Sequence, residues 1–369
     1  MKSCRFYIVL FAVFLLALGG CSKKKEESSN GTMYRGDLQR SGQLAGTALA
    51  KLSGEKWSYK TGYSVPGSPV TDGLSVYVGS MDRQVYALSL KDGSKQWESK
   101  VEGSVLSSPA LAGDNLYLGT NNNEFLALKK QDGQVLWRVG TKGEVRSSAA
   151  VVDGVVLFGD SSGTLYALKS ADGSTLWSAD LGGAILGSPA VEAKTVYVGS
   201  RSKKLAAFDL ETGAKKWEFT TRRDIVGGPS VTAGIVYVGS LDRQFYAVDA
   251  VSGAKKWTFR AGNEISSSPA VSQGMVYFGC DDNRVYALDA ANGEKKWVFA
   301  TRGMVGSSPT VVGDVLYVGS RDSHIYAIEA KSGKELWKFK TGGWVRSTPT
   351  LSEGLVLLGS DDGKVYALN

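Results

Sequence analysis

Few side chains of this sequence could perform catalysis. His324 is the single histidine, so a Ser-His-Asp site would have to use it. It follows the turn-forming residues 321–323, a context that favours a surface histidine over a catalytic one. We therefore expect no catalytic residues and no enzymatic activity.

Metal and cofactor sites are equally poorly represented. The runs 281–283 and 361–363, Asp-Asp-Asn and Asp-Asp-Gly, faintly resemble calcium loops, but neither is followed by the Glu that closes an EF-hand. The sequence has no C-x-x-C-H haem motif, no zinc-ligand spacing and no glycine-rich phosphate loop. We predict hairpin turns at the two acidic runs and neither a metal nor a cofactor.

The N-terminus has the composition of an export signal. Lys2 and Arg5 precede the uncharged apolar run 8–18, which is too short to serve comfortably as a permanent membrane span. Gly19 and Gly20 then lead directly to a cysteine. The order Leu-Gly-Gly-Cys resembles the lipobox of bacterial lipoproteins, which are cleaved before the cysteine and lipidated on it.

This resemblance implies a signal peptide over residues 1–20, a lipidated Cys21 with a tether and leader over residues 21–53, and a folded domain over residues 54–369. Ser22 follows the cysteine where many inner-membrane lipoproteins carry Asp, so we expect an outer-membrane lipoprotein that faces the periplasm. The alternative is an ordinary secretory signal with an incidental cysteine at the cleavage site.

The remaining cysteine has no partner for an internal disulfide. After removal of the signal, Cys280 is the only thiol apart from the acylated Cys21. An exported protein without a disulfide must be stabilised by a large core, and Cys280 is expected to be a small residue beside that core.

A repeat of forty residues organises the chain after residue 54. One copy contains four β-type runs, 228–231, 235–239, 244–249 and 255–259, separated by turn-forming residues. Four short strands per repeat of this length are typical of a β-propeller blade. The repeat is marked by tryptophans at constant spacing: Trp57, Trp97, Trp137, Trp177, Trp217, Trp257, Trp297 and Trp337.

The two ends of the chain predict how the ring closes. The last copy stops at Asn369, after its third strand, and the missing fourth strand is present at the other end as residues 56–60 around Trp57. The sequence therefore predicts an all-β fold, an eight-bladed β-propeller closed by its N-terminal strand, which removes the exposed edges of an open ring.

Residues 207–217 carry the pattern A-x-D-x-x-T-G-x-x-x-W. This resembles the tryptophan-docking motif of pyrroloquinoline-quinone-type (PQQ-like) propellers. Quinoprotein dehydrogenases share this motif. A closer resemblance to them would imply a disulfide between adjacent cysteines, against which the quinone is held, and a calcium ion. No two cysteines are adjacent in this chain, so quinone-dependent catalysis is the least favoured alternative.

The copies differ mainly around a constant Val or Ile eight residues after each tryptophan. Because loops carry recognition while the repeated positions carry the fold, we expect these variable interblade loops to bind a partner, although unconstrained drift of exposed loops would look the same. Residues 222–224 should lie near the equivalent loop of the next blade. The partner-binding candidates are Arg146, Arg222, Arg223, Asp224, Glu264, Trp344 and Arg346.

The net charge of +7 over 369 residues is mild and scattered, so nucleic-acid binding is not indicated. The lipobox, blade number and docking motif together resemble the BamB family, lipoproteins of the outer-membrane β-barrel assembly machinery. The resemblance implies a monomeric, non-enzymatic scaffold with a BamA-like protein partner. An unrelated lipoprotein propeller acting as a scaffold or ligand sensor is the main alternative.

Overall fold

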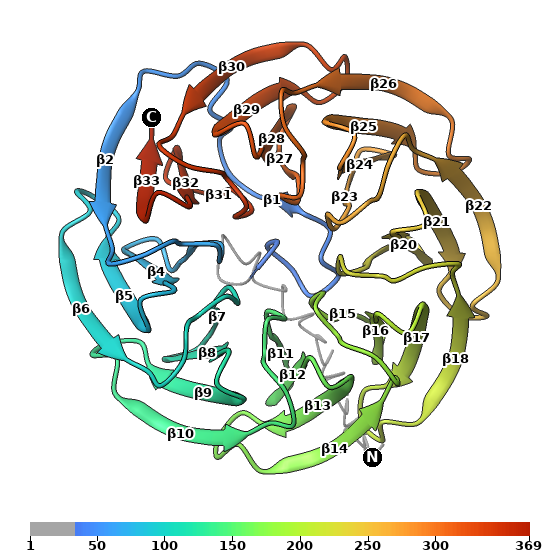
Figure 1. The fold of residues 1–369 in the computed structure, drawn as a ribbon, viewed down its shortest axis with the longest axis horizontal. Helices are drawn as coiled ribbons and strands as arrows, with labels where there is room; N and C mark the ends of the chain where they lie inside the picture. Colours follow the sequence, from blue (N-terminus) through green and yellow to red (C-terminus); the bar gives the residue numbers. More distant parts are fainter. Residues whose placement is uncertain (1–33) are drawn as a thin grey trace, which may run out of the picture.

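The computed structural model describes residues 34–369. The predicted signal peptide, residues 1–20, and the predicted lipidation site, Cys21, lie outside the described residues. Within residues 34–369 the chain forms eight sheets arranged around a central axis, with no α-helix (Figure 1). No helix in this part of the chain is therefore long and apolar enough to cross a membrane.

Each blade consists of four antiparallel strands. The innermost strands are β3 (Val70–Thr71), β7 (Ala110–Ala112), β11 (Ala150–Val152), β15 (Ala190–Glu192), β19 (Ser230–Thr232), β23 (Ala270–Ser272), β27 (Thr310–Val312) and β31 (Thr350–Ser352). The second strands are β4 (Ser75–Gly79), β8 (Asn115–Gly119), β12 (Val155–Gly159), β16 (Thr195–Gly199), β20 (Ile235–Gly239), β24 (Met275–Cys280), β28 (Val315–Gly319) and β32 (Leu355–Gly359).

The third strands are β5 (Gln84–Ser89), β9 (Glu124–Lys129), β13 (Thr164–Lys169), β17 (Lys204–Asp209), β21 (Gln244–Asp249), β25 (Arg284–Asp289), β29 (His324–Glu329) and β33 (Lys364–Leu368). The outer strands are β6 (Lys95–Lys100), β10 (Val135–Gly140), β14 (Thr175–Asp180), β18 (Lys215–Thr220), β22 (Lys255–Arg260), β26 (Lys295–Ala300), β30 (Glu335–Lys340) and β2 (Glu55–Lys60).

The predicted eight-bladed ring and its closure are confirmed. Strand β2 pairs antiparallel with β33, with Trp57 opposite Ala367, so one blade is built from both ends of the described chain. The backbone N–H of Asn369 donates to the carbonyl of Gly54, and the N–H of Gly54 donates back to Asn369, each at 3.0 Å. Closure leaves no open edge at this point of the ring.

The tryptophans connect each blade to the next. The indole N–H of Trp217 donates to the carbonyl of Ala250 at 3.0 Å, and its ring lies against Gly253, where a Cβ would come within 2.8 Å of the indole. Six other tryptophans make the same bond to the residue 33 positions further along: Leu90, Lys130, Ser170, Leu210, Ala290 and Ala330. Trp337 instead donates to the carbonyl of Leu49, a residue of the N-terminal segment that precedes β2.

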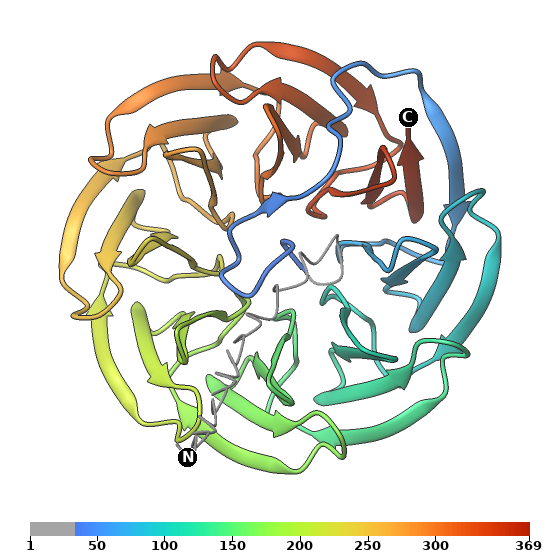
Figure 2. The ribbon, with the colours of Figure 1, turned by 180° about the vertical axis from the view of Figure 1, so that it is seen from behind.

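Residues 34–53, the described part of the leader, cross one end of the ring (Figure 2). Four neighbouring inner strands donate backbone hydrogen bonds to the leader carbonyls of Leu38, Gln39, Ser41 and Gly42. Strand β1 (Gln43–Leu44) then pairs in parallel with β27 and becomes a fifth strand of that sheet. The leader is therefore bound to the ring along most of its described length.

Candidate functional site

One face of the ring is formed by two sets of loops. The loop from each outer strand to the next inner strand, such as residues 61–69, lies beside the hairpin between the second and third strands, such as residues 80–83; the N–H of Met81 donates to Ser64 at 2.9 Å. The equivalent bond forms in all eight blades. In the last of them the N–H of Asp361 donates to the carbonyl of Trp344. We call this surface the loop face. Because its backbone is fixed in every blade, its side chains can vary without changing the fold.

Carboxylates in the hairpins connect neighbouring loops. Asp242 accepts the hydroxyl of Tyr246 at 2.8 Å and the backbone N–H of Arg222, in the adjoining loop, at 2.9 Å. Asp282 accepts in the same way from Tyr286, and burial together with this bond raises the pKa of Tyr286 to about 12. The acidic runs 281–283 and 361–363 form turns in the structure, and their second aspartates have this structural role.

The structure places several of the predicted partner-binding residues in ion pairs on the loop face. Arg223 Nη1 lies 2.6 Å from Glu264 Oε1, so loop 222–224 does contact the equivalent loop of the next blade. Asp224 Oδ2 accepts from Arg201 Nε at 2.9 Å. The side chain of Arg222 is exposed beside them. The two ion pairs therefore connect loop 222–224 to the next interblade loop and to the hairpin of Arg201.

Apolar side chains gather in a different sector of the loop face. Met304, Trp344 and Tyr63 lie on three consecutive interblade loops and are 39%, 49% and 61% exposed. Arg321 lies over the Trp344 ring, 5.6 Å from its centroid, and its Nη1 is 3.4 Å from the sulfur of Met304. We call Met304, Trp344 and Tyr63 the apolar arc. Among residues 34–369, no other large apolar side chain of the loop face is this exposed.

Next to the arc lies a surface hollow of about 500 Å³. Tyr63, Met81 and Arg346 are among the residues that line it. Arg346 is held by two bonds to Asp361, the shorter being 2.7 Å. Trp344 and Arg346 were predicted from the sequence, whereas Tyr63 and Met304 were not; Tyr63 becomes a neighbour of Trp344 only when the ring closes.

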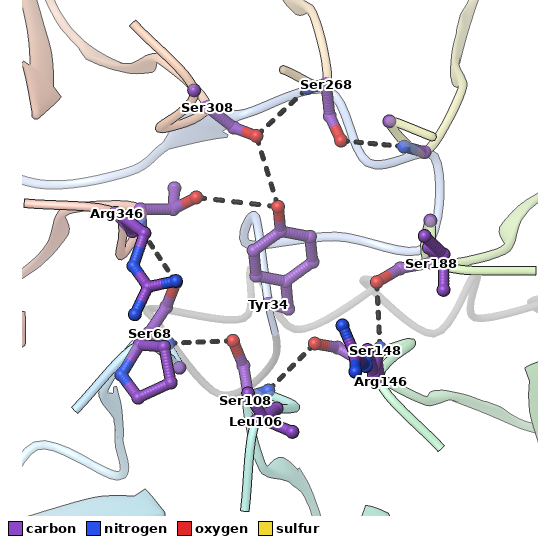
Figure 3. Close-up of a pocket in the computed structure, with 18 of the residues that line it drawn as sticks. Tyr34, Ser68, Leu106, Ser108, Arg146, Ser148, Ser188, Ser268, Ser308 and Arg346 are labelled. Atoms are coloured by element: carbon purple, nitrogen blue, oxygen red, sulfur yellow. Dashed lines mark hydrogen bonds between the residues drawn. The ribbon is translucent and has the colours of Figure 1, made fainter. Parts of the chain in front are cut away.

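A polar cavity of about 150 Å³ lies on the axis of the ring (Figure 3). Its wall includes Arg146 and Arg346, and its inner end is surrounded by a belt of hydroxyl residues that come one from each blade except the blade of Gly228. In the belt, a backbone N–H donates to the hydroxyl of the residue 40 positions further on, as Ser68 does to Ser108 at 2.9 Å. We call this ring the hydroxyl belt: Ser68, Ser108, Ser148, Ser188, Ser268, Ser308 and Thr348.

The leader closes the inner end of the cavity. The Tyr34 hydroxyl lies 3.2 Å from Ser308 Oγ and 3.4 Å from Thr348 Oγ1 (Figure 3). Below it, the buried guanidinium of Arg40 donates to the carbonyls of Pro189, Ala149 and Tyr34. Burial lowers the pKa of Arg40 to about 10. Arg35 is also buried and donates to carbonyls of two further blades. Tyr34, Arg35 and Arg40 were not predicted as site residues from the sequence, because they lie outside the repeat.

Cys280 is fully buried and occupies the place of a repeated serine. Its sulfur lies 3.4 Å from the carbonyls of Asn263 and Glu264, and Ser240 makes the equivalent contacts with its hydroxyl. Burial raises the pKa of the Cys280 thiol to about 12, so it stays protonated at neutral pH. Residues 34–369 contain no group of three or more His, Cys, Asp or Glu side chains placed to hold a metal ion.

The fold has clear relatives. It is similar to the crystal structure of BamB from Moraxella catarrhalis at 20% sequence identity, with a TM-score of 0.75 over 86% of this chain and 100% of that one. It is also similar to the computationally designed Ika8 protein (15% identity, TM-score 0.78, 85% and 99% covered) and to quinohemoprotein alcohol dehydrogenase from Comamonas testosteroni (16% identity, TM-score 0.79, 92% and 80% covered). At these identities the likeness concerns the fold alone.

No curated protein matches the sequence. The family model described as outer membrane protein assembly factor BamB matches residues 37–149, 127–227, 202–308 and 299–369, which together include nearly the whole described chain. The chain thus belongs to the BamB family of PQQ-like repeat propellers.

Proposed function

We propose that this protein is a lipid-anchored periplasmic scaffold that binds a protein of the outer-membrane β-barrel assembly machinery, a BamA-like partner, through its loop face. Membership of the BamB family supports a role in assembly. The apolar arc is the observation that carries the binding mode, because aromatic, methionine and arginine side chains are enriched at the centres of protein interfaces.

The arc is suited to recognition in a way that the opposite face is not. Its three side chains lie on adjoining loops, and Arg321 and Arg346 beside them provide planar donors for a partner's carboxylates or carbonyls. On the opposite face, Leu74 and Val251 are exposed in separate turns. Leu74 precedes β4 and Val251 follows β21, two strands on opposite sides of the ring (Figure 1). Exposed apolar side chains on adjoining loops favour an interaction site more than single exposed residues in separate turns do.

A pull-down tests the arc: the purified protein is immobilised, and its capture of the native membrane partner is measured. Trp344→Ala should weaken capture by at least tenfold, about 1.4 kcal/mol. Val251→Ala is the matched control, because Val251 is 86% exposed but lies on the opposite face. Equal capture by the two variants, with unchanged thermal midpoints, would exclude the arc as the binding surface.

The charged loop of residues 222–224 is tested separately. Reversing one ion pair with Arg223→Glu and Glu264→Arg keeps the two side chains attractive to each other but exchanges the charges that a partner meets. Reduced capture by this double variant would add the loop to the binding surface. Unchanged capture would assign the pair a structural role only.

Membrane attachment is a separate part of the proposal. We propose that Cys21 carries the lipid, because it follows the apolar run and the two glycines at residues 19 and 20. Cys21→Ser should release the protein from the membrane fraction, since multiple acyl chains are needed for stable anchoring. A variant that remains in the membrane pellet after a high-salt wash would contradict this anchor.

A further inference from the structure

The axial cavity has a chemical character that partner binding by the loop face does not explain. Its lining includes two arginines, Arg146 and Arg346, and no aspartate or glutamate. With about 150 Å³ it is smaller than a typical drug-sized site but has room for several waters, and hence for a small ion.

The hydroxyl belt presents hydrogen-bond donors to the cavity. Ser68, Ser108, Ser148 and Ser188 each accept a backbone N–H through Oγ, at 2.8 to 2.9 Å. A serine hydroxyl also has one hydrogen to donate, and within residues 34–369 none of these four donates it to a protein acceptor. All four are buried side chains that line the cavity, as Figure 3 shows.

The arginines of the wall are already held in place. Arg146 uses Nε and Nη2 on one oxygen of Glu144, and Arg346 uses the same two atoms on Asp361. Each guanidinium therefore keeps its Nη1 donors for another acceptor. Both arginines line the cavity, whereas Glu144 and Asp361 are not among its lining residues.

The floor of the cavity is also electropositive. Two buried guanidiniums, Arg35 and Arg40, lie in the leader with Asp37 as the neighbouring carboxylate. Burial alone would raise the pKa of Tyr34, but the Arg35 charge and the hydrogen bonds of Ser308 and Thr348 lower it below its ordinary value. The surroundings of the phenol oxygen thus favour a negative charge at the floor.

We propose that the axial cavity binds a small oxyanion, a phosphate or a carboxylate, whose oxygens accept from the belt serines and from Arg146 and Arg346. This site shares Arg346 with the hollow beside the apolar arc, but none of the three arc residues lines it. The ligand is either a free anion or the terminal carboxylate of a peptide that enters from the loop face.

The test introduces a carboxylate at the mouth of the cavity without altering an arginine or the arc. Leu186 lines the cavity in the blade next to that of Arg146. Leu186→Glu should raise the Kd for the anion at least tenfold, whereas the neutral Leu186→Gln should change it less than threefold. Val226→Glu and Val226→Gln form a second matched pair at an equivalent position, in case one pair alters the fold.

Binding is measured by calorimetry with inorganic phosphate, acetate, and a tetrapeptide with either a free or an amidated C-terminus. Saturable phosphate or acetate binding that is lost in Leu186→Glu supports a free oxyanion site. Saturable binding of the free-carboxylate peptide alone, abolished by amidation, supports capture of a chain end. Absence of saturable binding by every probe, or equal Kd values for the Glu and Gln variants in both pairs, would overturn the proposal.

Tyr34 provides an independent readout. A bound anion opposes formation of the phenolate, so the probe that binds should raise the pKa of Tyr34 in an absorbance titration at the tyrosinate band, with Tyr34→Phe identifying its signal. Calorimetric binding without any shift of this signal would place the anion elsewhere and contradict the proposal. Trp344→Ala should leave anion affinity unchanged while weakening partner capture, so the two proposals can fail separately.

Discussion

Gly253 tests how the blades are held together, because a single methyl group added there meets the docked tryptophan. A Cβ on Gly253 would lie 2.8 Å from the indole of Trp217 in the preceding blade. Gly234 is the matched control, since it belongs to the same blade and has nearly the same φ, 73° against 71°, but nothing lies within 4 Å of its Cβ position. The two alanine variants therefore share the backbone strain and differ in the contact.

The expected sizes follow from these two contributions. An alanine in the left-handed region costs about 1–2 kcal/mol, which is the whole expected effect of Gly234→Ala. Forcing a side chain into a packed interface costs about a further 1–3 kcal/mol. Gly253→Ala should therefore lower the free energy of unfolding by about 2–5 kcal/mol.

Urea unfolding at constant m-value measures the difference between the variants. Repeating both substitutions in a Trp217→Ala background removes the contacted ring, so the two alanines should then cost the same. Equal effects of Gly253→Ala and Gly234→Ala in the parent protein would refute the claim that indole docking on this turn stabilises the blade interface.

Three further expectations follow from buried groups. Cys280→Ser should change the free energy of unfolding by less than about 1 kcal/mol, because Ser240 makes the same contacts in the preceding blade. The buried thiol of the parent protein should react with a colorimetric disulfide reagent at pH 8 only after unfolding. Arg40→Met should lower the free energy of unfolding, measured by urea unfolding, by about 3 kcal/mol, because buried carbonyls lose their donors. Arg40→Lys should not restore this stability, because an ammonium group cannot reproduce the guanidinium contacts. Burial and Asp282 raise the pKa of Tyr286 to about 12, so the protonated phenol stabilises the fold fully below about pH 10 and this stability is lost as the pH rises toward 12. The thermal midpoint should fall over this interval, and it should fall less in Tyr286→Phe.

The blade architecture was predictable because every copy of the repeat places its strands, turns and tryptophan at the same positions. In the copy at residues 228–259, the second and third strands begin and end as expected, 235–239 and 244–249. The first strand begins at Ser230, two residues late. Pro229 has no N–H, and the N–H of Gly228 donates across the blades to Ser268, so neither residue joins the ladder.

The leader and the cavity floor were less predictable, for a physical reason. Arg35 and Arg40 donate to backbone carbonyls that every blade possesses, so no complementary residue type in the repeats announces these contacts. The apolar arc presents a related difficulty. Met304 and Trp344 are separated by one repeat, but Tyr63 joins them only through ring closure, which links the first loop of the ring to the last.

The pairing of β2 with β33 also dictates an order of events during synthesis. Trp57 is made 310 residues before its strand partner Ala367. Until then the growing chain exposes an unpaired strand at each end of an incomplete ring, the kind of edge that recruits foreign strands. Leu49 is likewise made 288 residues before Trp337, whose indole N–H donates to its carbonyl. The pairing of β2 with β33 is therefore the most non-local one in the ring, and the chain is most exposed to aggregation and proteolysis before it forms.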